Sequence, residues 1–303
     1  MSKARGLADL GNAYSDGALS NRNLIINGGF DVWQRSTDKT GAYFTYKTAD
    51  RWRHYNGAMS MRSYRVDTSS DTDVPTRYAL GLEVTAAGWG LKQVVEYLKA
   101  GTYTLSFYIK ASVAGSLKLY NSSDSVAITT SWQRVQKTIT VSSGQTDVFI
   151  VDNTSQTLVG TVYITGVQLE VGDTATPFEH RSYGQELALC QRYCQRFGNG
   201  ESNVLLGMAH TYVSGVSYGV LKYHSTMRTT PSATFSTNAA GAWRFRYGSG
   251  AQADNVGGST GIGADQFGQD QCRFYISTGT AADSNGWVRG QSSASYLILD
   301  AEL

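Results

Sequence analysis

The sequence predicts an all-β protein with two β-sandwich domains, and three observations support this prediction. Hydrophobic residues make up 41% of the 303 residues, which is enough for packed cores. Only 17% of the residues are charged and glycine occurs 33 times, a composition that favours short strands joined by many turns. Several segments alternate apolar and polar side chains with the period of two that a half-buried strand requires.

Residues 1–23 are the exception to this pattern. They are punctuated by glycine and contain too few apolar residues to bury a core of their own. They are either a terminal segment without a partner or a docking segment that becomes ordered on one. The segment has no apolar stretch of the kind found in a signal peptide, so we expect synthesis in the cytoplasm.

Two classes of partner are not expected. No apolar run is long enough to span a bilayer, so we expect no membrane insertion. The formal net charge is only +2, which provides no electrostatic footprint for a nucleic acid.

Residues 24–181 predict a jelly-roll β-sandwich of eight or nine strands. The clearest strand covers residues 102–110, where every second residue from position 103 to 109 is apolar. Alternation over residues 162–171 predicts the strand that closes the domain.

Residues 182–198 predict a short connecting helix, because Ser182 and Gln185 form the sequence pattern of a capping box. Apolar residues then recur at spacings of three, four and three, namely Leu187, Cys190, Cys194 and Phe197. This oligomer seam has two interpretations. It is the apolar side of a helix packed on an adjoining domain, or the contact of a three-fold bundle on a trimer axis.

Residues 199–303 predict a second, C-terminal β-sandwich. Alternation in residues 204–208, 272–277 and 296–303 predicts strands. Residues 248–269 are rich in Gly, Ala, Asp and Gln, which predicts a long exposed loop of the kind that carries contacts on rigid scaffolds.

Several motifs occur in an order that resembles one family. NLIINGGFDVW starts at Asn23, GTYTLSFYIKA at Gly101 and VYITGVQLEVGDTATPFEHRSYGQELALCQRYCQRF at Val162. With KARGLADLGN near the N-terminus, they resemble the carbohydrate-binding-module-like, galactose-binding-like jelly roll of bacteriophage tail fibres and related virion proteins. The resemblance covers about the first two thirds of the chain. It implies a virion protein, usually a homotrimer, and residues 1–23 would then dock on tail or baseplate proteins.

The resemblance also implies one possible cofactor, a structural calcium ion. Some members of the wider superfamily hold it with an acidic residue just after the opening NG-F motif and another in the last strand. Asp31 matches the first position. The last strand has Thr165 and Gly166 where the second acid is expected, and Glu170 is the nearest acid.

Aromatic side chains are the candidates for stacking on sugar rings. The candidates are Trp52, Tyr55 and Trp89 in the first domain and Trp243, Tyr247 and Trp287 in the second. The alternative for each indole is a place in a hydrophobic core, because tryptophan buries a large apolar surface.

Enzymatic activity is not expected from the motifs. Residues 215–219 and 257–261 match the G-x-S-x-G pattern, but neither is followed by the helix that a nucleophile elbow requires. No coil-length repeat indicates the parallel β-helix of depolymerising tail spikes.

Three functional hypotheses follow. The first is a non-enzymatic tail fibre or appendage that recognises host-surface glycans during adsorption. The second is a purely structural head fibre, decoration or adaptor protein. The third is a capsule-degrading tail enzyme, which would require a pair of carboxylates placed by the fold.

Overall fold

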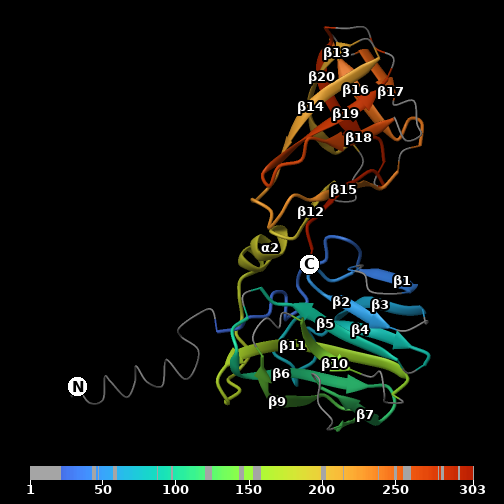
Figure 1. The fold of residues 1–303 in the computed structure, drawn as a ribbon. Helices are drawn as coiled ribbons and strands as arrows, with labels where there is room; N and C mark the ends of the chain where they lie inside the picture. Colours follow the sequence, from blue (N-terminus) through green and yellow to red (C-terminus); the bar gives the residue numbers. More distant parts are fainter. Residues whose placement is uncertain are drawn as a thin grey trace, which may run out of the picture. The chain divides into compact units, whose positions relative to one another are not determined.

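The computed structural model describes residues 22–302, apart from residues 43–45, 47, 57–59, 87, 97, 120–124, 143–146, 153–157, 199–202, 214, 238, 249–250, 255–260, 279, 281–282 and 293. The chain divides into two compact units, Met1–Leu187 and Ala188–Leu303 (Figure 1). Of the predicted docking segment 1–23, residues 1–21 lie outside the described residues.

The first unit contains two antiparallel sheets. The six-stranded sheet has the order β1-β3-β4-β11-β6-β9 and the five-stranded sheet the order β2-β5-β10-β7-β8. The strands of the first are β1 (Asp38–Ala42), β3 (Ser60–Asp67), β4 (Tyr78–Val84), β6 (Gly101–Ala111), β9 (Gln133–Val141) and β11 (Gly160–Val171). Those of the second are β2 (Arg53–Asn56), β5 (Trp89–Val94), β7 (Gly115–Lys118), β8 (Ser125–Ile128) and β10 (Asp147–Asp152).

One hydrophobic core lies between these two sheets. It combines side chains of the six-stranded sheet, such as Leu82 and Phe107, with side chains of the five-stranded sheet, such as Leu91 and Ile150. Each fully buried aliphatic or aromatic side chain of this kind contributes about 1.5–3 kcal/mol. The predicted strands at residues 102–110 and 162–171 are confirmed as β6 and β11.

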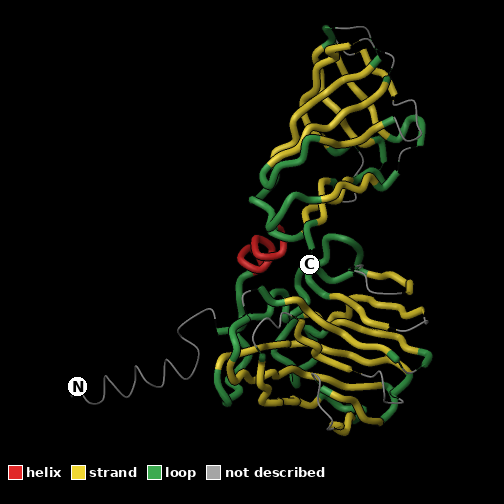
Figure 2. Tube along the Cα trace, viewed as in Figure 1, coloured by secondary structure: helices red, strands yellow, loops and turns green. Residues whose placement is uncertain are grey.

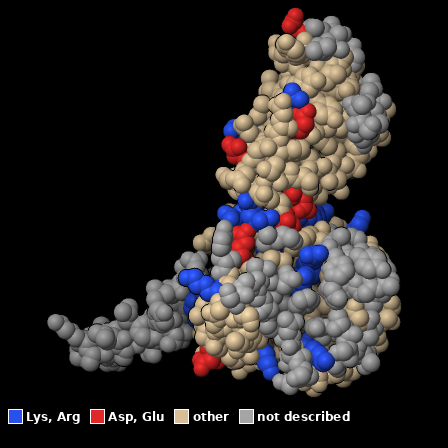
Figure 3. Space-filling model, viewed as in Figure 1, with Lys and Arg blue, Asp and Glu red and all other residues tan. Residues whose placement is uncertain are grey.

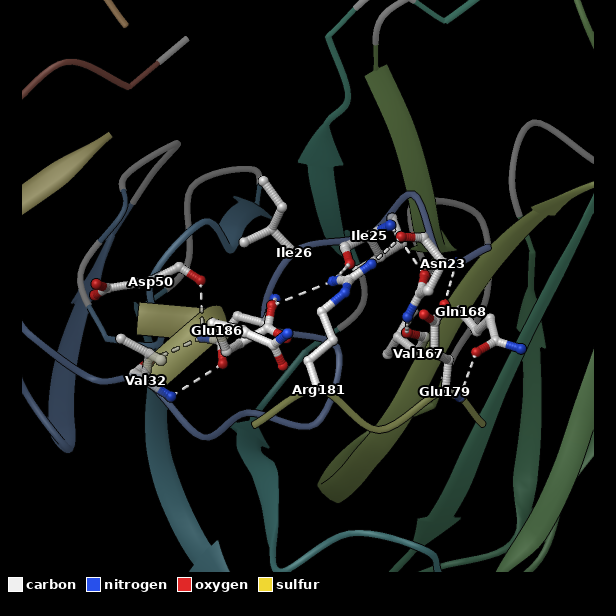
Figure 4. Close-up of polar contacts among 12 residues, drawn as sticks. Asn23, Ile25, Ile26, Val32, Asp50, Val167, Gln168, Glu179, Arg181 and Glu186 are labelled. Atoms are coloured by element: carbon white, nitrogen blue, oxygen red, sulfur yellow. Dashed lines mark hydrogen bonds and ion pairs between the residues drawn. The ribbon is translucent and has the colours of Figure 1, made fainter. Parts of the chain in front are cut away.

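Buried hydrogen bonds tie the segment before β1 to the closing strand β11 (Figure 4). The side-chain amide of Asn23 donates to the carbonyl oxygen of Val167 at 3.0 Å, and its oxygen accepts the backbone N–H of Leu169 at 3.1 Å. The carboxylate of Glu179 accepts the backbone N–H of Asn23 at 2.7 Å. The two ends of the first unit are thereby joined.

The Asn-Gly-Gly motif that follows has a structural explanation. Asn27 has a φ of 59°, and its side-chain nitrogen donates to the carbonyl oxygens of Val32 at 2.9 Å and Asp50 at 3.0 Å. A Cβ at Gly28 would lie 2.1 Å from the carbonyl oxygen of Val167, which only glycine avoids. The motif closes the loop against β11.

The predicted helix is confirmed in its first half as α2 (Tyr183–Gln191). Its capping box forms as expected. The backbone N–H of Ser182 donates to Oε1 of Gln185 at 2.9 Å, and the backbone N–H of Gln185 donates to Oγ of Ser182 at 3.3 Å. These bonds satisfy backbone donors that the first helical turn leaves free.

The second half of the predicted helix is wrong, because the chain forms the strand β12 (Cys194–Phe197) there. β12 pairs with the C-terminal strand, with Cys194 opposite Asp300 and Phe197 opposite Leu297. Residues three apart on a strand point to opposite faces.

The predicted oligomer seam therefore does not form a single helical stripe. Cys190 and Cys194 are fully buried within the chain, and Leu187 is half-buried. Phe197 stacks on His224 with 4.7 Å between the ring centroids.

The second unit also contains two antiparallel sheets, with the orders β12-β21-β15 and β17-β16-β20-β13-β14-β19-β18. The other strands of the smaller sheet are β15 (Ser232–Phe235) and β21 (Leu297–Asp300). Those of the larger sheet are β13 (Leu205–Val213), β14 (Val216–Lys222), β16 (Trp243–Tyr247), β17 (Ala251–Asp254), β18 (Ile262–Asp265), β19 (Gln271–Ser277) and β20 (Asn285–Gly290). A second core packs Leu297 and Leu299 with Phe245 and Phe274.

The predicted loop at residues 248–269 is in part wrong, because β17 and β18 form within it. They are the two edge strands of the larger sheet, and their backbones pair with β16 and β19. Strand dominates both units (Figure 2). No helix among the described residues has the length and apolar character needed to cross a membrane.

Candidate functional site

The outer face of the six-stranded sheet carries a group of aromatic and charged side chains, which we call the sheet-face cluster. Its members are Arg62, Tyr64, Glu83, Lys110, Trp132 and Tyr163. Leu80 and Leu82 of β4 point into the core, so the alternate positions of β4 and their cross-strand partners point outward. Arg62 is opposite Glu83, and both Tyr64 and Tyr163 are opposite Gly81.

Gly81 provides the space in which the ring of Tyr64 lies. A Cβ at this position would be 2.7 Å from Cζ of Tyr64 and within 3.0 Å of two further ring atoms. The phenol therefore lies flat over the middle strand of the cluster. The guanidinium of Arg62 stacks on the same ring, with its Cζ 4.6 Å from the centroid.

Two carboxylates hold Arg62 in this position. Its Nε and Nη2 donate to Asp38 at 2.9 and 2.6 Å, and its Nη1 donates to Glu83 at 2.8 Å. The hydrogen bond from Arg62 lowers the pKa of Asp38, so this carboxylate remains ionised. These groups are partly exposed, so the network positions the side chains more than it stabilises the fold.

A second cation lies at the other end of the cluster. Nζ of Lys110 is 4.7 Å from the ring centroid of Trp132 and 5.5 Å from that of Tyr163. Asp71 pairs with Lys110 at 3.4 Å and accepts the indole N–H of Trp132. The Trp132 and Tyr163 rings are in edge contact, with 6.5 Å between centroids.

The phenol of Tyr64 is a neutral hydrogen-bonding group. Burial, together with a hydrogen bond to Tyr163, raises the pKa of Tyr64 to about 12. The cluster thus presents three half-buried aromatic rings, interleaved with neutral and charged groups that donate and accept hydrogen bonds. A sugar ring has an apolar C–H face and a rim of hydroxyl groups, and such a surface complements both.

A cleft of about 580 Å³ is a separate feature of the first unit. Its lining includes Arg22, Leu24, Glu170 and Thr176. One oxygen of Glu170 accepts the backbone N–H of Thr176 at 3.0 Å and the other accepts its hydroxyl. Arg22 is 3.9 Å from the same carboxylate. Glu170 is thereby already paired within the chain, whereas Nε and Nη1 of Arg22 are buried and make no hydrogen bond among the described residues.

The prediction that Trp52, Trp89 and Trp243 stack on sugars is contradicted by their burial, since each is at most 2% exposed. Each indole N–H donates to a backbone carbonyl oxygen, of Asn27 at 2.8 Å, Leu158 at 3.3 Å and Thr237 at 3.0 Å respectively. The alternative of core aromatics holds for these three, because an indole buries a large surface once its N–H finds a partner.

The other three aromatic candidates differ from one another. Trp287 is 39% exposed, on the face of the larger sheet opposite the core. Tyr247 is half-buried and stacks on Phe245 with 5.4 Å between centroids. Tyr55 belongs to β2, opposite Gly90, and its side chain is outside the described part of the structure.

The two predicted calcium ligands have different neighbours. Burial raises the pKa of Asp31, and the charges of His180 and Arg77 oppose this shift. Glu170 is paired as described above. In the ranges that the structure describes, no group of three or more His, Cys, Asp and Glu side chains could hold a metal ion.

The first G-x-S-x-G match does not form a nucleophile elbow. Ser217 is the second residue of β14 and is buried, and its hydroxyl is 2.7 Å from that of Thr211. Of the second match, residues 257–260 lie outside the described residues.

Sequence reasoning missed the sheet-face cluster. The pattern placed Tyr108 and Lys110 on the polar side of one strand and Glu83 on the polar side of another. An aromatic residue such as Tyr108 on the polar side of a strand could have indicated that the outer face of this sheet carries aromatic side chains. The pattern could not show that Tyr64, Tyr163 and Trp132 share one face.

A scan against protein-family models found no match, and no curated protein matches in sequence. Among solved structures, the chain is distantly similar to TmCBM61 in complex with β-1,4-galactotriose, at 17% identity and a TM-score of 0.31, over 50% of this chain and 100% of that chain. The xylan-binding CBM22-1 domain of Paenibacillus barcinonensis Xyn10C gives 14% identity and a TM-score of 0.34, over 45% and 95%. The enzymatically active domain of tailspike protein 4 of bacteriophage CBA120 gives 15% identity and a TM-score of 0.30, over 50% of this chain but only 22% of the tailspike chain.

Proposed function

We propose that this chain is a non-enzymatic virion protein, a short tail fibre or similar appendage, that binds host-surface glycans through the sheet-face cluster. The observation that carries glycan binding is the gathering of Tyr64, Trp132 and Tyr163 on one outward sheet face. The virion setting rests on the ordered sequence motifs, as do the homotrimer and the docking role of residues 1–23.

Binding would use the two kinds of surface that the cluster offers. The aromatic rings would stack on the C–H faces of pyranose rings. The phenol of Tyr64 remains neutral and its proton is engaged with Tyr163, so its oxygen would accept from a sugar hydroxyl, as would Glu83 and Asp71. Because Arg62 and Lys110 hold the carboxylates and rings in place, little side-chain freedom is lost on binding.

Glycan-array binding of the full chain, followed by calorimetry on the best neutral oligosaccharide, tests this proposal. Tyr163→Ala removes the central ring, and we expect at least about tenfold weaker affinity, or ~1.4 kcal/mol. Tyr183→Ala is the matched control, because Tyr183 is a 60% exposed tyrosine on α2. Equal affinity of the Tyr163→Ala variant and the wild type would remove the sheet-face cluster from the proposal.

Assays on the full chain also distinguish the proposed function from the two alternatives, a structural virion component and a capsule-degrading enzyme. A structural head fibre, decoration or adaptor would bind no glycan on the array, and antibody against it would leave adsorption unchanged. A capsule-degrading enzyme would release reducing ends from host polysaccharide. Labelling of the protein in intact virions tests the proposed location.

A further inference from the structure

β16 and β20 are neighbouring strands of the larger sheet in the second unit (Figure 1). Side chains that can donate hydrogen bonds lie along their outer face. Arg244 is opposite Arg289, and Arg246 is opposite Trp287. Residues 287, 289 and 291 alternate to the same side, so Gln291 extends this row beyond the end of β20. On the far side of β16, Asp254 of β17 is opposite Arg244.

Three of these donors have no acceptor within the described residues. Nε of Arg246, Nε of Arg289 and Nε2 of Gln291 are buried and make no hydrogen bond there. A buried donor without a partner destabilises the fold, so such groups are uncommon unless something satisfies them. Burial and the charges of Arg246 and Arg244 lower the pKa of Arg289, as expected where like charges are held together.

Elsewhere on the same sheet, basic side chains have acidic partners. Arg273 is 2.7 Å from Asp265, and Lys222 is 3.4 Å from Asp270. On the face of the second unit that Figure 3 shows, basic side chains lie next to acidic ones, and an acidic side chain at the top has no basic neighbour in view. Arg246 and Arg289 differ because the Nε donor of each has no acceptor among the described residues.

Apolar side chains border the arginines. Trp287 is 39% exposed and its cross-strand partner Met208 is 65% exposed. Val220 continues the row on β14 and is 59% exposed. An aromatic face beside donors without acceptors is complementary to a ligand that combines an apolar ring face with negative charge.

We propose that this row, which we call the arginine row (Arg246, Trp287, Arg289 and Gln291), binds an acidic glycan. The carboxylate, phosphate or sulfate group of the sugar would pair with the guanidinium groups of Arg246 and Arg289, and the sugar ring would stack on Trp287. Arginine suits such groups because its planar fork donates two parallel hydrogen bonds. The site is separate from the sheet-face cluster of the first unit and extends the proposed function to a second, charged class of glycan.

Titration calorimetry on the full chain at low salt tests this proposal with defined polymers. Polygalacturonate carries carboxylates, teichoic acid carries phosphates, dextran sulfate carries sulfates, and β-1,4-galactan is the neutral counterpart. We expect at least one acidic polymer to bind and neutral galactan not to bind at this row. The affinity for the acidic polymer should fall as salt screens the charges.

Arg246→Gln and Arg289→Gln each remove one charge and the donor fork, and we expect at least about tenfold weaker binding of the acidic polymer. Arg273→Gln is the matched control, since Arg273 is on the same sheet and already paired with Asp265. Arg289→Gln also relieves like-charge crowding, so its thermal midpoint should equal or exceed that of the wild type. Tyr163→Ala should leave acidic-polymer binding unchanged, which separates this site from the one in the first unit.

Several outcomes would overturn the proposal. One is that no acidic polymer binds, and another is that Arg273→Gln weakens binding as much as Arg246→Gln does, which would indicate general attraction of a polyanion. A third is that Arg246→Gln and Arg289→Gln change the molecular mass measured by light scattering but not the affinity for the polymers. That result would assign the face to contact between copies of the chain.

Discussion

At the scale of single residues, one missing side chain shapes the sheet-face cluster. Gly81 is buried and has no left-handed backbone conformation, so the reason for glycine here is space and not φ. The ring of Tyr64 occupies the volume that a Cβ would need. The position of the Tyr64 ring in the sheet-face cluster therefore depends on a residue that has no side chain.

Gly81→Ala tests this dependence. The new Cβ would lie 2.7 Å from Tyr64, so we expect the ring to move and glycan affinity to fall. Stability should change by less than about 1 kcal/mol, because alanine is more favourable than glycine in a strand. The raised pKa of Tyr64 should return towards its usual value, which ultraviolet titration measures. In Gly184→Ala, the control, the new Cβ has open space and glycan affinity should not change.

Glu186 gives a prediction of pH dependence. It is 6% exposed, and burial raises its pKa although the N–H of Asn27 and the charge of Arg181 act in the opposite direction. A raised folded-state pKa contributes stability that is complete below the unfolded value near 4.5 and is lost as the pH rises through the folded value. Relative to Glu186→Gln, the wild type should therefore gain free energy of unfolding as the pH falls from 7 to 4.5. Urea unfolding across this range measures it, and parallel curves for the two proteins would contradict it.

At the scale of elements, the change from α2 to β12 shows a local pattern giving way to long-range pairing. The capping box starts the helix where the sequence predicts it. The apolar spacing would continue the helix to residue 198, but pairing of residues 194–197 with β21 ends it at Gln191. Cys194 is fully buried in the resulting strand.

Ser182→Ala tests the helix start. The variant loses the hydroxyl that accepts the backbone N–H of Gln185, and we expect a cost of ~1 kcal/mol in the unfolding of the first unit. Ser182→Thr retains a hydroxyl at the same place and should recover most of this stability. If alanine and threonine behave alike in urea unfolding, the cap does not stabilise α2.

At the scale of the whole molecule, each unit has its own hydrophobic core. The two clusters share no residue, and each lies between the two sheets of its own unit. This arrangement is typical of domains that can unfold as separate cooperative steps.

Calorimetry of two core variants tests the independence of the units. Leu80→Ala should lower the stability of the first unit by about 2–5 kcal/mol, and Phe274→Ala should lower that of the second by about 3–5 kcal/mol. Each variant should shift a different thermal transition. A single transition that moves with both substitutions would show that the units unfold together.

The all-β class, the principal strands and the start of α2 could all be predicted from the amino-acid sequence. These features are local, because a period of two and a capping box are visible within about ten residues. The Asn-Gly-Gly motif is also visible in the sequence, but the reason for its glycine is not. Gly28 is needed because the carbonyl oxygen of Val167 lies where a Cβ would be. For each candidate tryptophan, the sequence was compatible both with stacking on a sugar and with a place in a hydrophobic core.

The grouping of side chains on one surface could not be predicted, because it depends on which strands pair. Tyr64 and Tyr163 lie on β3 and β11 of one sheet, and Trp132 comes directly before β9 of the same sheet. Arg246 and Arg289 share a face because β16 pairs with β20. The cores enclose Trp52, Trp89 and Trp243, so these side chains cannot contact a ligand at the surface. The physical reason is the same in each case. Alternation assigns a residue to one of two faces, but strand pairing over long sequence separations decides its neighbours.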